Sequence, residues 1–224
     1  MNHLLVATTN KGKLKEILRI FSSEIPELVL HTLDEFPEAV DVEESGATFE
    51  ANALLKARAG FALSGLPTLA DDSGLEIDAL GGRPGIHSAR YSGGGDAANI
   101  AKVLEEMSEV SLSSRTARFV TVVAFVAPSS GDSVLRGHAT GEITVRGELE
   151  GIITSSPRGD GGFGYDPIFQ PGTYLPSHDP SQDALTLAQM RPEEKDEISH
   201  RGRALRKIAP MVGLRFAQIQ RPVE

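Results

Sequence analysis

Residues 117–127 read ARFVTVVAFVA and form the longest run of strand-forming residues in the chain. Branched and aromatic side chains of this kind suit a β-sheet, so we expect a strand over Ala117–Ala127. A second run, Val134–Val145, is predicted to pair with it across the turn PSSGD at residues 128–132. Strands and helices alternate elsewhere. A hairpin beside such an alternation predicts an α/β fold with a mixed β-sheet and flanking helices.

The chain begins with a predicted strand, a polar loop and a helix. We expect a buried strand over His3–Ala7, followed by a helix in which Leu14, Ile17, Leu18 and Phe21 recur at spacings of three and four. No repeat and no long linker interrupts the sequence. The other predicted elements are strands over Leu28–Thr32, Pro67–Ala70, Leu75–Leu80 and near Ile168, helices over Thr48–Leu63 and Ala97–Met107, and helical structure from about Pro192 onward.

The charge of the chain argues against a nucleic-acid partner. It has 22 Lys and Arg against 31 Asp and Glu, a net charge of −9, whereas a long polyanion is bound by an excess of cations. The whole excess lies between Arg19 and Lys56, a window with nine acids and no Lys or Arg. Such a window is typical of a solvated loop. Alternatively, one or two of its acids hold a divalent cation.

The chain contains no cysteine. Disulfides, thiolate metal sites and thiol nucleophiles are therefore excluded. The apolar stretch at the N-terminus is too short for a signal peptide, and no run approaches the roughly 20 apolar residues of a membrane-spanning helix. We expect a cytoplasmic protein with no membrane partner.

A polar hexapeptide separates the first predicted strand from its helix. It consists of Thr8, Thr9, Asn10, Lys11, Gly12 and Lys13. Backbone N–H groups at a helix N-terminus, hydroxyl groups and two lysines suit a phosphate group. The glycine spacing of a Walker P-loop is absent. Alternatively, Thr8 or Asn10 acts only as the N-cap of the helix.

Two adjacent acids, Asp71 and Asp72, follow the predicted strand Pro67–Ala70. Ligands of α/β folds gather at the carboxyl ends of strands, so these acids are well placed for a metal ion or for general-base chemistry. Neighbouring residues of an extended chain point to opposite sides. We therefore expect one acid to enter the site and the other to cap a following turn, or both to serve only as turn residues.

A glycine-rich segment, RGDGGFGYDP, covers Arg158–Pro167. Its glycines allow the backbone to approach a ligand closely, and its two aromatic rings offer faces on which a nucleobase can stack. Asp166 offers an acceptor for N–H groups of a base. The alternative is a glycine-rich turn with one aromatic side chain in the core.

A charged segment near the C-terminus contains Lys195, His200 and Arg201. On one unbroken helix, Lys195 and His200 lie about 140° apart. A break with Ser199 as N-cap brings the three side chains closer together. The alternative is a surface helix with ordinary charge pairs.

Five segments in order resemble the Ham1/RdgB/ITPase family of non-canonical purine nucleoside triphosphate pyrophosphatases. They are LLVATTNKGKLKEI (4–17), EESGATFEANALLKA (43–57), LADDSGLEIDALGGRPGIHSARYSG (69–93), GGFGYDPIF (161–169) and EEKDEISHRGRAL (193–205). The resemblance implies that residues 1–224 form a single domain of two lobes around a central cleft, and that the protein is a homodimer. It also implies Mg²⁺-dependent hydrolysis of ITP, dITP and XTP to the monophosphate and pyrophosphate.

The resemblance also implies roles for individual residues. Residues 8–13 and Lys56 bind the phosphates. Glu43 and Asp72 hold the metal, with Glu44 as the alternative to Glu43, and Asp72 is the proton acceptor. The remaining substrate contacts are Ser73, Phe163, Gly164, Tyr165, Asp166, Lys195, His200 and Arg201.

Two other functions are compatible with these motifs. The first is a pyrophosphatase that removes modified pyrimidine nucleotides. The second is a non-catalytic nucleotide sensor, which would not need the acids Glu43 and Asp72.

Overall fold

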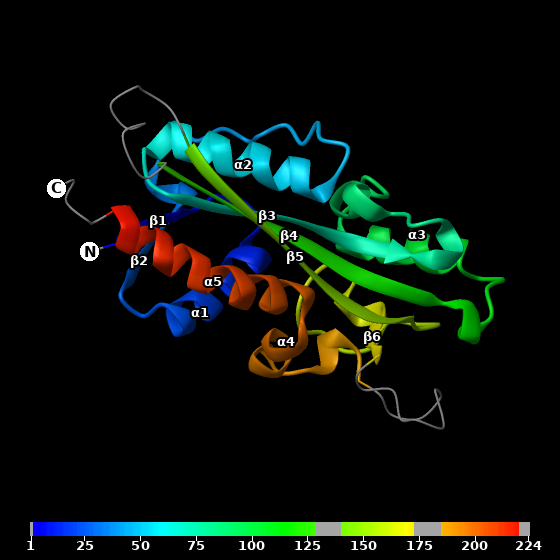
Figure 1. Cartoon of the computed structure of the whole chain (residues 1–224). Coiled ribbons are helices and arrows are strands. Elements are labelled where there is room, and N and C mark those ends of the chain that lie inside the picture. Colours follow the sequence, from blue (N-terminus) through cyan, green and yellow to red (C-terminus); the bar gives the residue numbers. More distant parts are fainter. Residues whose placement is uncertain (1, 129–139, 173–184, 220–224) are drawn as a thin grey trace. The chain divides into compact units, whose positions relative to one another are not determined.

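Six strands form one hydrogen-bonded sheet in the order β2-β1-β3-β4-β5-β6. β1 is parallel to both β2 and β3, whereas β5 and β6 are antiparallel, so the sheet is mixed as predicted. The computed structural model describes residues 2–128, 140–172 and 185–219 (Figure 1). Its helices and strands are β1 (Asn2–Val6), α1 (Lys11–Glu24), β2 (Leu28–Thr32), α2 (Phe49–Ser64), β3 (Thr68–Ile77), α3 (Asp96–Glu106), β4 (Thr116–Pro128), β5 (Thr140–Ile153), β6 (Phe169–Pro171), α4 (Pro192–Ile198) and α5 (His200–Ile219).

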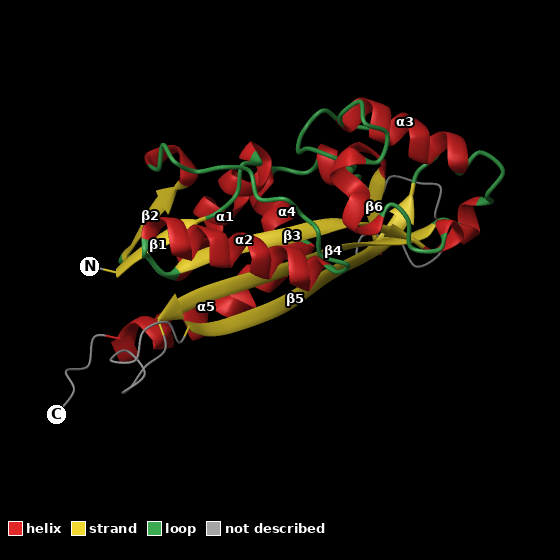
Figure 2. Ribbon diagram, turned by 90° about the horizontal axis from the view of Figure 1, so that it is seen from above, coloured by secondary structure: helices red, strands yellow, loops and turns green. Residues whose placement is uncertain are grey.

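The chain divides into two compact units. The first contains Met1–Asp72, Thr121–Gly147 and Arg201–Glu224, and the second contains Ser73–Val120 and Glu148–His200. Three of the four boundaries fall inside the strands β3, β4 and β5, which Figure 2 shows in yellow, and the fourth follows His200, the first residue of α5. Each of these strands therefore contributes residues to both units. The predicted cleft stays a prediction.

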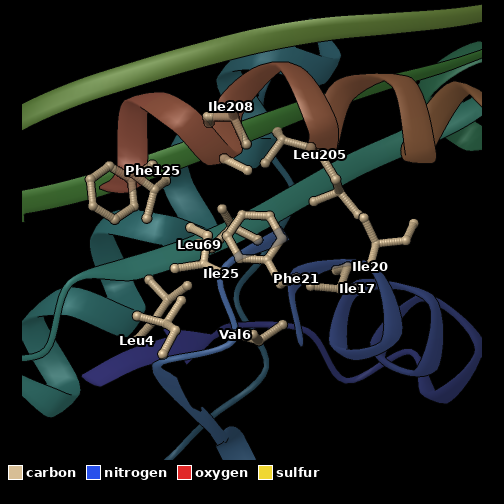
Figure 3. Close-up of a cluster of buried hydrophobic side chains, with 14 of the residues drawn as sticks. Leu4, Val6, Ile17, Ile20, Phe21, Ile25, Leu69, Phe125, Leu205 and Ile208 are labelled. Carbon is tan, nitrogen blue, oxygen red and sulfur yellow. The ribbon is translucent and has the colours of Figure 1, made fainter. Parts of the chain in front are cut away.

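The core of the first unit lies on one face of its strands, against α1 and α5. Leu4, Val6 and Leu69 are fully buried there. They belong to the same cluster as Phe21 of α1 and Leu205 of α5, and Figure 3 shows these side chains gathered together. The two residues from β1 are two positions apart, as expected for side chains on one face of a strand.

Helix α2 covers the opposite face of the strands in the first unit (Figure 1). It comes so close at Gly60 that a Cβ atom there would lie 2.8 Å from Thr68 Cγ2 and 3.0 Å from Ala7 Cβ. The sheet in this unit is therefore covered on both faces, and the side chains of β3 alternate between the two layers.

The second unit has its own core, to which β3, β4, α3 and the segment after β5 contribute. Leu75, Val103 and Phe169 are buried in one cluster. The ring of Phe119 packs against that of Phe169 with centroids 4.6 Å apart. Within the described ranges, none of the helices is long and apolar enough to cross a membrane.

Most predicted elements are confirmed, but the strand expected to end before the two acids is wrong. β3 runs through Asp71 and Asp72 to Ile77, and only then does a 3₁₀ turn, Asp78–Leu80, replace the rest of the strand predicted over Leu75–Leu80. Both acids thus belong to a strand between β1 and β4, and their carboxylates contact lysines, so neither serves as a turn residue.

The predicted hairpin is confirmed as a pair of neighbouring strands, β4 and β5. In the described residues β5 covers Thr140–Ile153, so the strand extends eight residues beyond the predicted end at Val145. Residues 129–139, which include most of the predicted turn at 128–132, lie outside the described part of the chain.

The close approach of α2 to the sheet predicts the effect of a methyl group at Gly60. Although alanine is a better helix former than glycine, we expect Gly60→Ala to lower the free energy of unfolding by about 1–3 kcal/mol because the added atom overpacks the interface. Urea denaturation measures this change. Gly213→Ala in α5, where a Cβ meets nothing within 4 Å, is the control and should stabilise the protein by about 0.5–1 kcal/mol. Equal effects of the two substitutions would contradict the packing argument.

Candidate active site

The two acids of β3 point to opposite faces of the sheet, and each has its own set of partners. Asp71 contacts Lys13 of α1 and Arg201 of α5. Asp72 contacts Asn52 and Lys56 of α2. The alternation of side chains along a strand explains this division. Each acid thus belongs to a different charge cluster, and the two clusters lie on opposite faces of the same strand.

The cluster on the α1 and α5 face is a buried ion-pair network. Arg201 is only 1% exposed. Its Nε donates to Asp71 Oδ2 at 3.1 Å, and its Nη1 donates to Glu16. Lys13 Nζ lies 3.4 Å from the same Asp71 oxygen. Buried charges are tolerated only when they are paired in this way.

The protonation of this network follows from burial and from its ion pairs. Burial raises the pKa of Asp71, but the charges of Lys13 and Arg201 outweigh it and hold that pKa well below its usual range. Burial lowers the pKa of Lys13. Asp71 is therefore an ionised carboxylate, and its Oδ1 has no hydrogen-bond partner among the described residues.

The cluster on the α2 face contains two carboxylates and one ammonium group. Lys56 Nζ lies 2.8 Å from Glu44 Oε1 and 3.2 Å from Asp72 Oδ1. Burial raises the pKa of Asp72. For Lys56, burial lowers the pKa of the ammonium group, but the carboxylates of Asp72, Asp71 and Glu44 together outweigh it, so that pKa is raised. Glu43, the predicted metal ligand, has an exposed side chain.

Asn52 also belongs to this cluster, and sequence reasoning did not find it. It is fully buried, and its side chain bonds both Asp72 and the backbone N–H of Gly46. A signal was present in the sequence, because Asn52 and Lys56 are four residues apart and so share one face of the predicted helix.

Several polar groups of the predicted phosphate loop, residues 8–13, already take part in hydrogen bonds within the protein. Asn10 is the N-cap of α1, and its Oδ1 accepts from the N–H groups of Gly12 at 2.9 Å and Lys13 at 3.0 Å. Asn10 is therefore an N-cap, and the binding of phosphate by residues 8–13 stays a prediction. Thr8 Oγ1 accepts from the Asn10 N–H at 3.3 Å, and Thr9 Oγ1 donates to Asp41 at 3.5 Å. Lys11 is exposed.

The glycine-rich segment of the second unit is built around Asp166. Its Oδ2 lies 2.5 Å from Lys195 Nζ and accepts from the Phe163 N–H at 2.9 Å. Lys195 Nζ is also 4.7 Å from the centroid of the Phe163 ring. Lys195 and Asp166 are buried. The structure thus joins three of the residues predicted to contact a base.

Two further hydrogen bonds anchor this segment within the second unit. The buried Tyr165 donates its hydroxyl to the Ser88 carbonyl at 2.8 Å, and burial raises its pKa. Asp96, at the first residue of α3, accepts from the Gly164 N–H at 2.8 Å. Tyr165 is therefore the aromatic residue in the core, and Phe163 is the more exposed ring.

The predicted break in the C-terminal helix is confirmed. α4 ends at Ile198, Ser199 is extended, and α5 begins at His200. The His200 ring stacks on Phe119 with centroids 4.7 Å apart. Arg201, in contrast, has the partners described above in the first unit, so its predicted contact with a base stays a prediction. Ser73, the next residue after Asp72, is half-buried in β3.

The donor set suits a hard cation such as Mg²⁺. Among the described residues no group of three or more His, Asp or Glu side chains is placed to hold a metal ion. Asp72 and an acid of the neighbouring loop are the two carboxylates nearest to such a site in the described part of the chain. Mg²⁺ commonly binds through one or two carboxylates, with substrate phosphates supplying further oxygens.

The fold and these clusters define the class of protein: a mixed-sheet α/β protein with acids and lysines suited to a metal-bound phosphate group. Comparison with known families is more specific, since the profile of the Ham1 family matches residues 4–211. The chain belongs to the Ham1 family.

Several proteins similar to the chain are named dITP/XTP pyrophosphatases. A dITP/XTP pyrophosphatase of Symbiobacterium thermophilum is 47% identical over 202 residues, which cover 90% of each chain. One of Mycolicibacterium paratuberculosis is 46% identical and covers 94% of this chain and 95% of its own. The structure of the Staphylococcus aureus Ham1 protein is 34% identical with a TM-score of 0.75, covering 96% of this chain and 100% of that one.

The buried network around Arg201 predicts a large loss of stability when the guanidinium is removed. In Arg201→Ala, the carboxylates of Asp71 and Glu16 lose their buried partner, so we expect the free energy of unfolding to fall by about 3–5 kcal/mol. Urea denaturation measures the loss. Lys207→Ala, an exposed lysine of the same helix, is the control and should change stability by less than about 0.5 kcal/mol. A similar small effect at Arg201 would refute the role of the network.

Proposed function

We propose that this chain hydrolyses non-canonical purine nucleoside triphosphates, namely dITP, ITP and XTP, to the monophosphate and pyrophosphate. The observation that carries the proposal is the acid pair of β3, with a lysine beside each carboxylate, in a chain of the Ham1 family. The similar proteins named dITP/XTP pyrophosphatases support the choice of substrate.

We assign the triphosphate to the charged groups of the first unit. Lys13 and Lys56 already lie beside carboxylates, so their charges are held in place before any substrate binds. Residues 8–13 contribute hydroxyl groups and the lysines. Asp72 and Glu43 would hold Mg²⁺, while Glu44 keeps Lys56 in position through its 2.8 Å contact. Bound Mg²⁺ supplies neutralisation of the triphosphate and of the leaving pyrophosphate.

The chemistry is one in-line displacement at the α-phosphorus. Water forms the new P–O bond, the bond from the α-phosphorus to the pyrophosphate oxygen breaks, and Asp72 accepts a proton from the water. No covalent intermediate with the protein is needed, because such reactions depend mainly on positioning and charge neutralisation.

We assign the base to the second unit. Phe163 offers a stacking surface, and Lys195 and His200 supply donors for the 6-oxo group of hypoxanthine or xanthine. Adenine carries a 6-amino donor at that position, so a buried donor of the protein would lose its partner. Such a loss costs roughly 1–3 kcal/mol per contact, which favours 6-oxo purines.

A panel of nucleoside triphosphates with Mg²⁺ tests the function. We expect pyrophosphate from dITP, ITP and XTP, far less from dATP, and little from a methylated pyrimidine triphosphate. Orthophosphate as the direct product would contradict attack at the α-phosphorus. Preference for the methylated pyrimidine would favour the pyrimidine alternative, and binding of ITP without pyrophosphate release would favour a sensor.

In the same assay Asp72→Asn should abolish turnover while retaining nucleotide binding, because the variant loses the proton acceptor. An unchanged kcat would refute the assignment of Asp72.

A matched pair of variants decides which acid holds the metal. We expect Glu43→Gln to raise the Mg²⁺ concentration needed for half-maximal pyrophosphate release by about 10- to 100-fold, because a carboxylate ligand is lost. Glu44→Gln should mainly raise the KM for the nucleotide, since it releases Lys56. The reverse pattern would assign the metal to Glu44.

The predicted homodimer and cytoplasmic location stay predictions, as does the assignment of the whole chain to a single domain. None of them is needed for the reaction described above.

A further inference from the structure

Asn52 joins residues 43–46, the acidic loop before α2, to Asp72 through one buried side chain. Its Oδ1 accepts from the Gly46 N–H at 2.8 Å, and its Nδ2 donates to Asp72 Oδ2 at 3.1 Å. A buried amide is costly unless both ends are bonded. The two ends are not interchangeable, because a backbone N–H only donates and an ionised carboxylate only accepts.

Gly46 is adapted to this contact by its lack of a side chain. A Cβ atom at this position would lie 2.6 Å from Asn52 Oδ1 and 2.8 Å from Ala51 Cβ. Glycine is required here for space and not for a left-handed backbone conformation, because the φ angle of Gly46 is not positive. The backbone of the acidic loop therefore approaches α2 more closely than any other residue would permit.

Lys56, one turn further along α2, also links the loop to Asp72, but through a charged ammonium group. It contacts Glu44 of the loop and Asp72 of β3. Two residues on one face of α2 thus each join the loop to Asp72. The neutral Asn52 bonds the backbone of the loop at Gly46, and the charged Lys56 contacts the side chain of Glu44.

We propose that Asn52 is a positioning residue for the metal end of the substrate, an inference that rests on the proposed function. It sets the position of the loop backbone at residues 43–46 relative to the Asp72 carboxylate, so that an acid of the loop and Asp72 meet one cation. Aspartate at position 52 would lose the donor and place a second carboxylate against Asp72. Leucine would lose both bonds.

The test disturbs the contact from each side and measures three quantities: the Mg²⁺ dependence of pyrophosphate release, the KM for dITP and the hydrogen exchange of the loop. Asn52→Ala removes the amide, and Gly46→Ala forces the loop away from it. Because partners that orient metal ligands typically contribute 10- to 100-fold to metal affinity, we expect both variants to raise the Mg²⁺ concentration for half-maximal pyrophosphate release at least about tenfold. The KM for dITP at saturating Mg²⁺ should change far less. Hydrogen exchange of residues 43–48, measured without substrate or metal, should become faster.

Two controls separate this role from a general loss of stability. Gly213→Ala adds a methyl group in open space and should change neither the Mg²⁺ midpoint, nor the KM for dITP, nor the exchange of residues 43–48. Asn99→Ala removes the other buried helical asparagine of the described residues, which bonds Ser92 and Ser88 within the second unit. It should lower stability but leave the Mg²⁺ midpoint and the exchange of residues 43–48 unchanged.

Each outcome bears on the proposal. An unchanged Mg²⁺ midpoint in folded Asn52→Ala and Gly46→Ala proteins overturns it. If Asn52→Ala does not fold, Asn52→Asp keeps the shape and the acceptor for Gly46, and an unchanged midpoint in that variant also overturns it. If the wild type releases no pyrophosphate, the proposed function fails separately. Unchanged exchange of residues 43–48 would then still refute the positioning role.

Discussion

The ion pair between Asp71 and Arg201 is the interaction on which the first unit depends. It places two opposite charges from distant parts of the sequence in the interior, with Glu16 and Lys13 as further partners. Buried charges of this kind lose most of their solvation, so each is tolerated only because the others are present. Three segments that enclose the hydrophobic core, α1, β3 and α5, are thereby joined by polar contacts as well as by apolar packing.

This network also defines what the other face of β3 can do. Lys13 and Arg201 hold Asp71 in the ion-pair network, and its neighbour Asp72 faces α2, where burial outweighs the charge of Lys56 and raises the pKa of Asp72. A raised pKa suits the proposed role of Asp72 as a proton acceptor. The geometry of an extended chain thus gives two adjacent residues of the same type different partners.

The sequence predicted the elements better than the partners of individual side chains. Periodicity located α1 because burial on one face is a local pattern, and β2 and α2 also lie within a residue of their predicted bounds. The continuation of β3 through two acids was missed, since aspartate is typical of turns and its cationic partners lie on other elements. Arg201 was grouped with Lys195 by sequence proximity, yet its guanidinium bonds Asp71. Asn52 was overlooked because a single amide has no distinctive pattern until its two partners are known.

The alternation of β3 constrains how this gene can change. Loss or gain of one residue between Thr68 and Asp71 would turn the following carboxylates to the wrong faces, so that one acid would meet the apolar layer and the other would leave Arg201 uncompensated. Length variation should therefore be tolerated in the irregular stretch before Gly46 and purged from the strand. Among natural variants, β3 should accept substitutions of its apolar residues far more readily than the insertion or deletion of a single residue.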